Sequence, residues 1–201
     1  MNRSLSRAWL GLVLFVPIGA FAQLAGPEFR VNTYTTNIQR AAAVAVDGSG
    51  NFVVVWSSQN EESAASGLGI FGQRYASSGS PVGGEFLVNS RTTNAQYAPS
   101  VASDSSGNFV VVWQGAGQDG NGYGVFGQRF NSAGTPAGAE FRVSSYTTLN
   151  QRAPAVAAAP SGDFVAVWES ASGDGSSYGV FGQRYASSGS PLGSEFPINT
   201  F

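Results

Sequence analysis

The chain has 201 residues with 12 Asp and Glu against 10 Arg, no Lys, and a formal net charge of −2, and it contains no His or Cys. The lack of a basic excess argues against nucleic acid or an anionic membrane as the main partner. The missing His and Cys exclude Ser-His-Asp and Cys-His nucleophilic systems, ordinary zinc sites and disulfides.

The first element along the chain predicts export. Arg3 and Arg7 precede an apolar run that ends in the small-residue cleavage pattern at Ala22. We expect residues 1–22 to be a cleaved signal peptide. No later apolar run is long enough for a transmembrane segment. The sequence therefore predicts a protein that is secreted, or held in the periplasm or at the cell surface of a bacterium.

The rest of the chain, residues 23–201, reads as a single region of internal repeats. Its strings recur with offsets of 57 and then 55 residues, which gives units at about 41–89, 98–144 and 153–199. A repeat of roughly this length is typical of solenoids, propellers and arrays.

Each unit shows four β signals, separated by turns rich in Gly, Ser, Asn, Asp and Pro. The first is a run of small residues, the second is FVVVW or FVAVW, the third contains FGQR, and the fourth begins with Glu-Phe. In the first unit they lie at 41–46, 52–56, 70–75 and 85–89. The pattern predicts tandem four-stranded antiparallel sheets in an all-β protein.

The second strand of each unit favours blades of a β-propeller. FVVVW is apolar at every position, so both of its faces must be covered, and the chain offers only other sheets to do so. The alternative is a β-sandwich, which covers only the inner faces of its sheets. Three tryptophans end these strands, and we expect them in the core between blades: Trp56, Trp113 and Trp168.

Three units do not close a propeller ring within one chain, since propellers typically need four or more blades. The Glu-Phe strand nevertheless occurs a fourth time, as a spare strand at residues 28–33. Two explanations remain open. The spare strand completes a blade in a second chain, so that a homodimer forms a six-bladed ring, or the sequence is a truncated piece of a longer array.

The string EFRVNTYTT…FVVVW…DGNGYGVFGQRF…EFRV resembles a repeat of large secreted bacterial surface proteins. The resemblance covers residues 28–201, and in those proteins the repeat often stands beside cadherin-like or hemolysin-type calcium-binding segments. It implies β-propeller-like units and a role in surface display, adhesion or ligand binding. It supplies no catalytic residues.

Two repeated loops hold the candidate ligand-binding residues: Asp119, Tyr123, Asp174 and Tyr178. The tyrosines are flanked by Gly and Ser, so they are expected to be exposed and able to contact a sugar. Each aspartate stands in an Asp-Gly pair that a plain turn also explains. Because each loop offers one carboxylate without EF-hand spacing, we predict no metal site and no cofactor, with calcium as the alternative.

The arginine of FGQR and the glutamate of the next strand recur together in every unit. An arginine facing a neighbouring blade needs a partner, because an unpaired buried charge is prohibitive. We predict structural pairs that fix the strand register: Arg74 with Glu85, Arg129 with Glu140, and Arg184 with Glu195.

These observations predict an exported, non-enzymatic binding or adhesion module whose ligand is a carbohydrate or a protein. The alternative from another class is a structural spacer or a segment of a larger adhesin. A glycan-active hydrolase is a third hypothesis, because two carboxylates suffice for that chemistry. Its candidate residues are Glu61, Glu62, Asp119, Glu169 and Asp174.

Overall fold

The computed structural model describes residues 28–61, 67–171 and 177–199, and these residues form strands and turns. The predicted signal peptide and the candidates Glu62 and Asp174 lie outside the described residues. Within the described ranges, no helix has the length and apolar character needed to cross a membrane.

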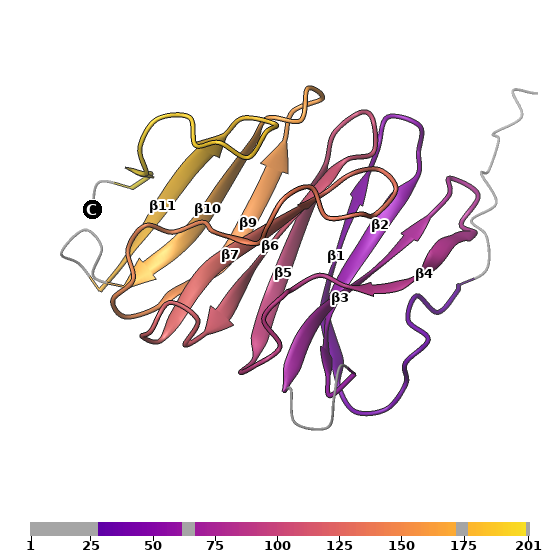
Figure 1. The fold of residues 1–201 in the computed structure, drawn as a ribbon, viewed down its shortest axis with the longest axis horizontal. Coiled ribbons are helices and arrows are strands. Elements are labelled where there is room, and N and C mark those ends of the chain that lie inside the picture. The colour runs from indigo at the N-terminus through magenta and orange to yellow at the C-terminus, as the bar shows by residue number, and fades with distance from the viewer. Residues whose placement is uncertain (1–27, 62–66, 172–176, 200–201) are drawn as a thin grey trace, which may run out of the picture.

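Three four-stranded antiparallel sheets follow one another along the chain and stack face to face (Figure 1). Unit 1 contains β1 (Gln39–Val46), β2 (Phe52–Gln59), β3 (Leu68–Tyr75) and β4 (Pro81–Leu87). Unit 2 contains β5 (Gln96–Ser103), β6 (Phe109–Ala116), β7 (Tyr123–Phe130) and β8 (Phe141–Arg142). Unit 3 contains β9 (Gln151–Ala158), β10 (Phe164–Ala171), β11 (Tyr178–Tyr185) and β12 (Phe196–Pro197). The strand order within each sheet is sequential, as in propeller blades arranged in an open ring.

Strand β6 shows why FVVVW is apolar throughout. Successive side chains of a strand point to opposite faces. Val111 and Trp113 therefore join the core shared with unit 1, while Val110 and Val112 join the core shared with unit 3. All four are buried. The propeller-like prediction is confirmed, and the β-sandwich alternative does not describe the structure.

The fourth strand is shorter than predicted in two units, and the spare strand does not form. The predicted strands at 140–144 and 195–199 shrink to β8 and β12, and residues 28–33 form no strand. In units 1 to 3 the fourth strand pairs with the third strand of its own sheet. Residues 28–33 have no such neighbour among the described residues, so the apolar pattern alone does not produce a strand there.

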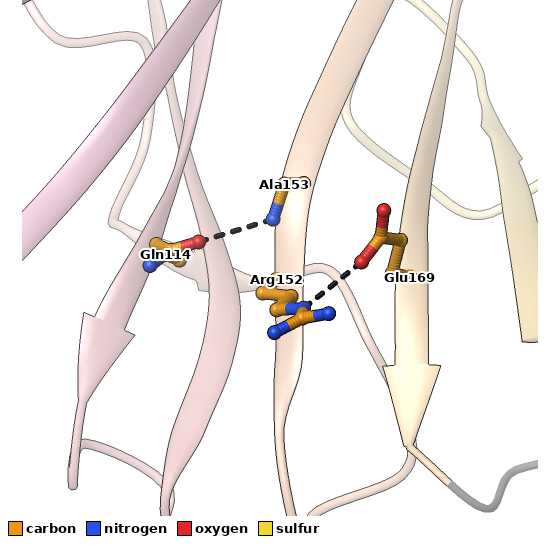
Figure 2. Close-up of polar contacts among 4 residues, drawn as sticks. All are labelled: Gln114, Arg152, Ala153 and Glu169. Atoms are coloured by element: carbon orange, nitrogen blue, oxygen red, sulfur yellow. Dashed lines mark hydrogen bonds and ion pairs between the residues drawn. The ribbon is translucent and has the colours of Figure 1, made fainter. Parts of the chain in front are cut away.

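The first strand of each unit contains a β-bulge, and the bulge of unit 3 links its sheet to that of unit 2. Ala41, Ala98 and Ala153 have φ values of 54°, 47° and 50°, and each lies at a register shift. The bulge at Ala153 turns its N–H out of the ladder, and the N–H donates to Gln114 Oε1 on β6 at 3.0 Å (Figure 2). The bulge therefore supplies a hydrogen bond between units 2 and 3.

Arg152 and Glu169 form an ion pair across β9 and β10, with Arg152 Nε 2.9 Å from Glu169 Oε2 (Figure 2). Both side chains are more than two-fifths exposed. Such surface pairs contribute about 0–1 kcal/mol, so this one adds little to the stability of unit 3.

Tyr185 gives a prediction for alkaline pH. Its buried ring lies between units 2 and 3, and its hydroxyl donates to the Val143 carbonyl at 3.1 Å. Burial, followed by the charge of Glu195, raises the pKa of Tyr185 from 10.0 to about 12. The neutral phenol thus contributes stability that is fully present below pH 10 and is lost as the pH rises towards 12. Unfolding free energies measured across this window should fall, and Tyr185→Phe should flatten the fall.

Candidate functional site

Two equivalent grooves open between successive sheets, at the end where the first and second strands of each unit are joined. The first groove, between units 1 and 2, has a volume of about 370 Å³, and the second groove, between units 2 and 3, about 500 Å³. The first groove is lined by Asp47, Phe52, Arg74, Ser106, Phe109 and Ser132 among others. The second groove is lined by Asp104, Phe109, Arg129, Ser161, Phe164 and Ser187 among others.

The carboxylate of each groove is held rigidly by its own turn. Asp47 Oδ1 accepts the backbone N–H groups of Ser49 and Asn51 at 2.8 and 2.9 Å, and Oδ2 accepts Asn51 Nδ2 at 2.9 Å. The Asn51 side chain, together with backbone N–H groups and against some desolvation, holds the pKa of Asp47 below its usual value. Asp104 forms the same three bonds in the second groove. Each Oδ2 retains a lone pair, because a carboxylate oxygen accepts two hydrogen bonds.

The guanidinium group of each groove bridges two units. Arg74 Nη1 donates to the Ser132 carbonyl at 2.8 Å, and Arg129 Nη1 donates to the Ser187 carbonyl at 2.7 Å. The Nε and Nη2 groups of both arginines have no hydrogen-bond partner among the described residues. They are therefore available as donors at the groove wall.

The predicted pairs of these arginines with glutamates are wrong. Each glutamate accepts hydrogen bonds from the preceding unit instead, and two of the three pairs involve a backbone N–H and a hydroxyl from one serine. Glu140 Oε2 accepts Ser90 N at 2.7 Å and Ser90 Oγ at 2.8 Å, and Glu195 Oε2 accepts the same groups of Ser145 at 2.8 and 2.9 Å. Glu85 accepts from Thr33. The arginines point to the following unit and the glutamates to the preceding one, so Arg74 and Glu85, Arg129 and Glu140, and Arg184 and Glu195 do not pair.

This arrangement predicts different effects for equivalent arginines. Arg129→Met removes a charged hydrogen bond between units 2 and 3, which should lower the unfolding free energy by about 1.5–3 kcal/mol. Arg184 is exposed and has no hydrogen-bond partner in the described part of the chain, so Arg184→Met should change it by less than about 0.5 kcal/mol. Urea unfolding of the two variants at low protein concentration, where the chain is monomeric, measures the difference. Equal losses would contradict the bridging role.

The residues predicted as ligand contacts lie at the opposite end of the sheets. Tyr123 begins β7 and is half-buried, with its ring 5.9 Å from that of Tyr97. Tyr178 begins β11 and is 38% exposed, with the Arg152 guanidinium 4.0 Å from its ring centroid. Asp119 Oδ1 accepts the Asn121 N–H at 3.3 Å in a turn. None of these side chains lines either groove.

The groove residues were missed by sequence reasoning, although a signal exists. Asp47-Gly-Ser-Gly-Asn and Asp104-Ser-Ser-Gly-Asn were interpreted only as turns. The sequence does not reveal that each turn faces a Gly of the next unit. A Cβ at Gly107 would lie 3.0 Å from Asp47 Oδ2, and one at Gly162 would lie 3.2 Å from Asp104 Oδ2.

Comparison with known proteins identifies the fold and no family. No family model matches the chain, and no curated protein matches it in sequence. Among solved structures, an alpha-L-arabinofuranosidase from Lactobacillus brevis is 12% identical with a TM-score of 0.57, over 86% of this chain and 61% of that one. An endo-arabinase from Bacteroides thetaiotaomicron is 14% identical with a TM-score of 0.47, over 75% and 59%. A fucose lectin from Kordia zhangzhouensis is 11% identical with a TM-score of 0.43, over 80% and 98%.

This chain thus spans about three fifths of the length of the first two structures. At these identities the likeness is one of fold.

Proposed function

We propose that the protein is a non-catalytic carbohydrate-binding module whose ligand occupies the first and second grooves. The observation that carries the proposal is that both grooves repeat one set of polar groups: a fixed carboxylate, a guanidinium with free donors, and serines. A sugar hydroxyl can donate to Asp47 Oδ2 while accepting from Arg74. Phe52 is half-buried, so its accessible part offers apolar surface to a sugar ring in the first groove.

The charges of the grooves favour a neutral, polyhydroxylated ligand. Each groove contains one carboxylate and one guanidinium. An anionic ligand is therefore repelled by Asp47 or Asp104, and a cationic ligand is repelled by Arg74 or Arg129. Neither charge is neutralised by a direct partner of opposite charge within its groove. The arabinofuranosidase that shares the fold acts, by its name, on a carbohydrate, which agrees with the proposal.

The single carboxylate in each groove supports binding over hydrolysis. Glycoside hydrolysis by the usual mechanisms needs two carboxyl groups, about 5–9.5 Å apart, around one bond. Asp47 is the one acidic residue lining the first groove, and Asp104 is the one lining the second. The chain also has no His or Cys to act as an alternative nucleophile or base.

A glycan array followed by calorimetry with the bound sugars tests the proposal. We expect two sites per chain, and the double variant Asp47→Asn with Asp104→Asn should weaken binding at least about tenfold, since one hydrogen bond to a charged group is worth 1.5–3 kcal/mol. Asp163→Asn is the control for loss of a turn carboxylate outside the grooves, because Asp163 lies in the corresponding turn of unit 3, at the position of Asn51 and Asn108, and lines neither groove. Absence of any bound glycan would favour the spacer role instead.

The proposed setting is outside the bacterial cytoplasm, on the basis of the signal-like sequence at residues 1–22. N-terminal sequencing of the protein recovered from an expressing bacterium should begin at residue 23. Retention of Met1 in the cytoplasm would contradict export.

A further inference from the structure

Residues 28–33 pack against unit 1 in the same way as the fourth segment of unit 2, which contains β8 and Val143, packs against unit 3. Tyr75 donates to the Val31 carbonyl at 2.8 Å, just as Tyr185 donates to the Val143 carbonyl at 3.1 Å. The ring of Phe29 lies 5.5 Å from that of Tyr75, and Phe141 lies 5.6 Å from Tyr185. Residues 28–33 therefore lie, without forming a strand, where the fourth strand of a preceding sheet would lie, and the described residues of this chain provide no such preceding sheet.

The fourth segment of each unit makes two hydrogen bonds to the third strand of its own sheet, and residues 28–33 make neither of them with the described residues. Val143 N donates to Val125 O at 2.8 Å, and the side chain of Asn89 accepts the Ile70 N–H at 2.6 Å. The equivalent groups are Val31 N and Asn32 Oδ1, and neither has a hydrogen-bond partner among the described residues. This edge is shaped to receive a third strand.

The opposite end of the stack presents a third strand on an open face. Val180 on β11 is 36% exposed and Ile198 beside β12 is 50% exposed, whereas Val125, the equivalent of Val180 in unit 2, is fully buried. Arg184 on β11 is exposed. Units 1 and 2 each pack this face against the next unit. In unit 3 the equivalent face is exposed.

Unit 1 has an uncovered surface at the position where units 2 and 3 are each covered by an arginine of the preceding unit. A Cβ at Gly134 would lie 2.7 Å from Arg74 Nε, and one at Gly189 would lie 2.5 Å from Arg129 Nε, because each arginine of a preceding unit packs over that glycine. The equivalent glycine of unit 1 is Gly79, and a Cβ there meets nothing within 4 Å. The carbonyl of Ser77, equivalent to those of Ser132 and Ser187, lies beside this space.

We propose that a second copy of this chain fills both open ends, by head-to-tail association of unit 3 of one copy with unit 1 of the next. Arg184 of one copy donates to the Ser77 carbonyl of the other, and β11 pairs with the edge at Val31 and Asn32. At each internal interface, the face of one unit that carries the arginine meets the face of the next unit that carries the serine carbonyl. Unit 3 exposes the first of these faces and unit 1 exposes the second, so a second copy of the chain fits both.

The association includes an exchange of the fourth strand. Residues 28–33 and residues 195–199 fill the same position, so the segment 195–199 of one copy gives way to residues 28–33 of the other. The exchange replaces the bonds that Ile198 N and Asn199 Oδ1 make to Val180 of β11 with equivalent bonds from Val31 N and Asn32 Oδ1. Added strands bind through such main-chain bonds.

Cross-linking in the cysteine-free chain tests the contact. The double variant Ser77→Cys with Arg184→Cys, treated with a short bismaleimide, should give covalent dimers or longer oligomers. Ser132→Cys with Arg74→Cys reproduces the same contact inside one chain and should give an internal link, which verifies the reagent's reach. Single-cysteine variants should give no linked chains, and linkage of either one alone would point to a symmetric interface and overturn the proposal.

Sedimentation velocity across a concentration series gives the second readout. We expect reversible association, with Arg184→Met raising the dissociation constant about tenfold, as for loss of one charge-assisted hydrogen bond. Arg142→Met, the same change at an exposed arginine of unit 2, should leave the constant unchanged. A folded protein that stays monomeric at its highest soluble concentration, or an Arg184→Met effect no larger than that of Arg142→Met, would overturn head-to-tail association.

Discussion

Trp113→Ala is expected to lower the free energy of unfolding by about 3–5 kcal/mol, as is usual when a large buried aromatic is truncated. The Trp113 side chain is fully buried in the core between units 1 and 2, and its Nε1 donates to Gln96 Oε1 at 3.0 Å. The variant leaves a cavity and takes a donor from the buried amide of Gln96. Domains are stable by only about 5–15 kcal/mol, so this loss is a large fraction of the total.

Urea unfolding followed by far-ultraviolet circular dichroism measures the effect of Trp113→Ala. Tyr146→Ala is the control, since Tyr146 is 39% exposed outside the strands and its truncation should cost less than about 1 kcal/mol. If both variants lost the same free energy, Trp113 would not be a core residue of the interface. If Trp113→Ala failed to fold, Trp113→Phe, with a smaller cavity, should fold with an intermediate loss.

Gly134→Ala should destabilise the protein more than Gly79→Ala, although the two glycines have almost the same backbone conformation. Their φ values are 80° and 83°, so a side chain at either position costs about 1–2 kcal/mol of backbone strain. At Gly134 the new Cβ also meets Arg74 Nε at 2.7 Å and must displace the arginine that bridges units 1 and 2. The added loss should bring Gly134→Ala to about 2–4 kcal/mol.

The comparison separates backbone strain from the contact between units. Both variants are measured by chemical unfolding at a protein concentration where the chain is monomeric, because the space over Gly79 is the one that a second copy is proposed to fill. Losses that agreed within about 0.5 kcal/mol would show that Arg74 moves aside freely and holds no unit in place.

The architecture could be predicted from the sequence because its strongest signal is local. Five apolar residues at 109–113 need cover on two faces, and stacked sheets provide it. The fourth strands were predicted less well. Their pattern is apolar at alternate positions in every copy, but whether a strand forms depends on a third strand beside it, which residues 28–33 lack.

The side-chain pairs and the grooves depend on geometry that the sequence leaves open. Arg129 and Glu140 are close in sequence and opposite in charge, which favoured a pair, yet they leave their sheet on opposite faces. A backbone carbonyl also accepts hydrogen bonds from arginine, and because every residue has one, the residue type does not reveal it. Each groove arises where the turn between the first and second strands of one unit meets that of the next, so its lining joins residues far apart in the sequence, such as Asp47 and Gly107.

The bonds between units also bear on how such a chain can evolve. Each interface uses an arginine, a backbone carbonyl, a glutamate and a hydroxyl residue that recur at the same place in every repeat. A gene duplication or deletion that adds or removes one whole repeat therefore joins halves that already fit, and requires no compensating substitution. The number of blades becomes a quantity that recombination can change while each junction keeps its chemistry.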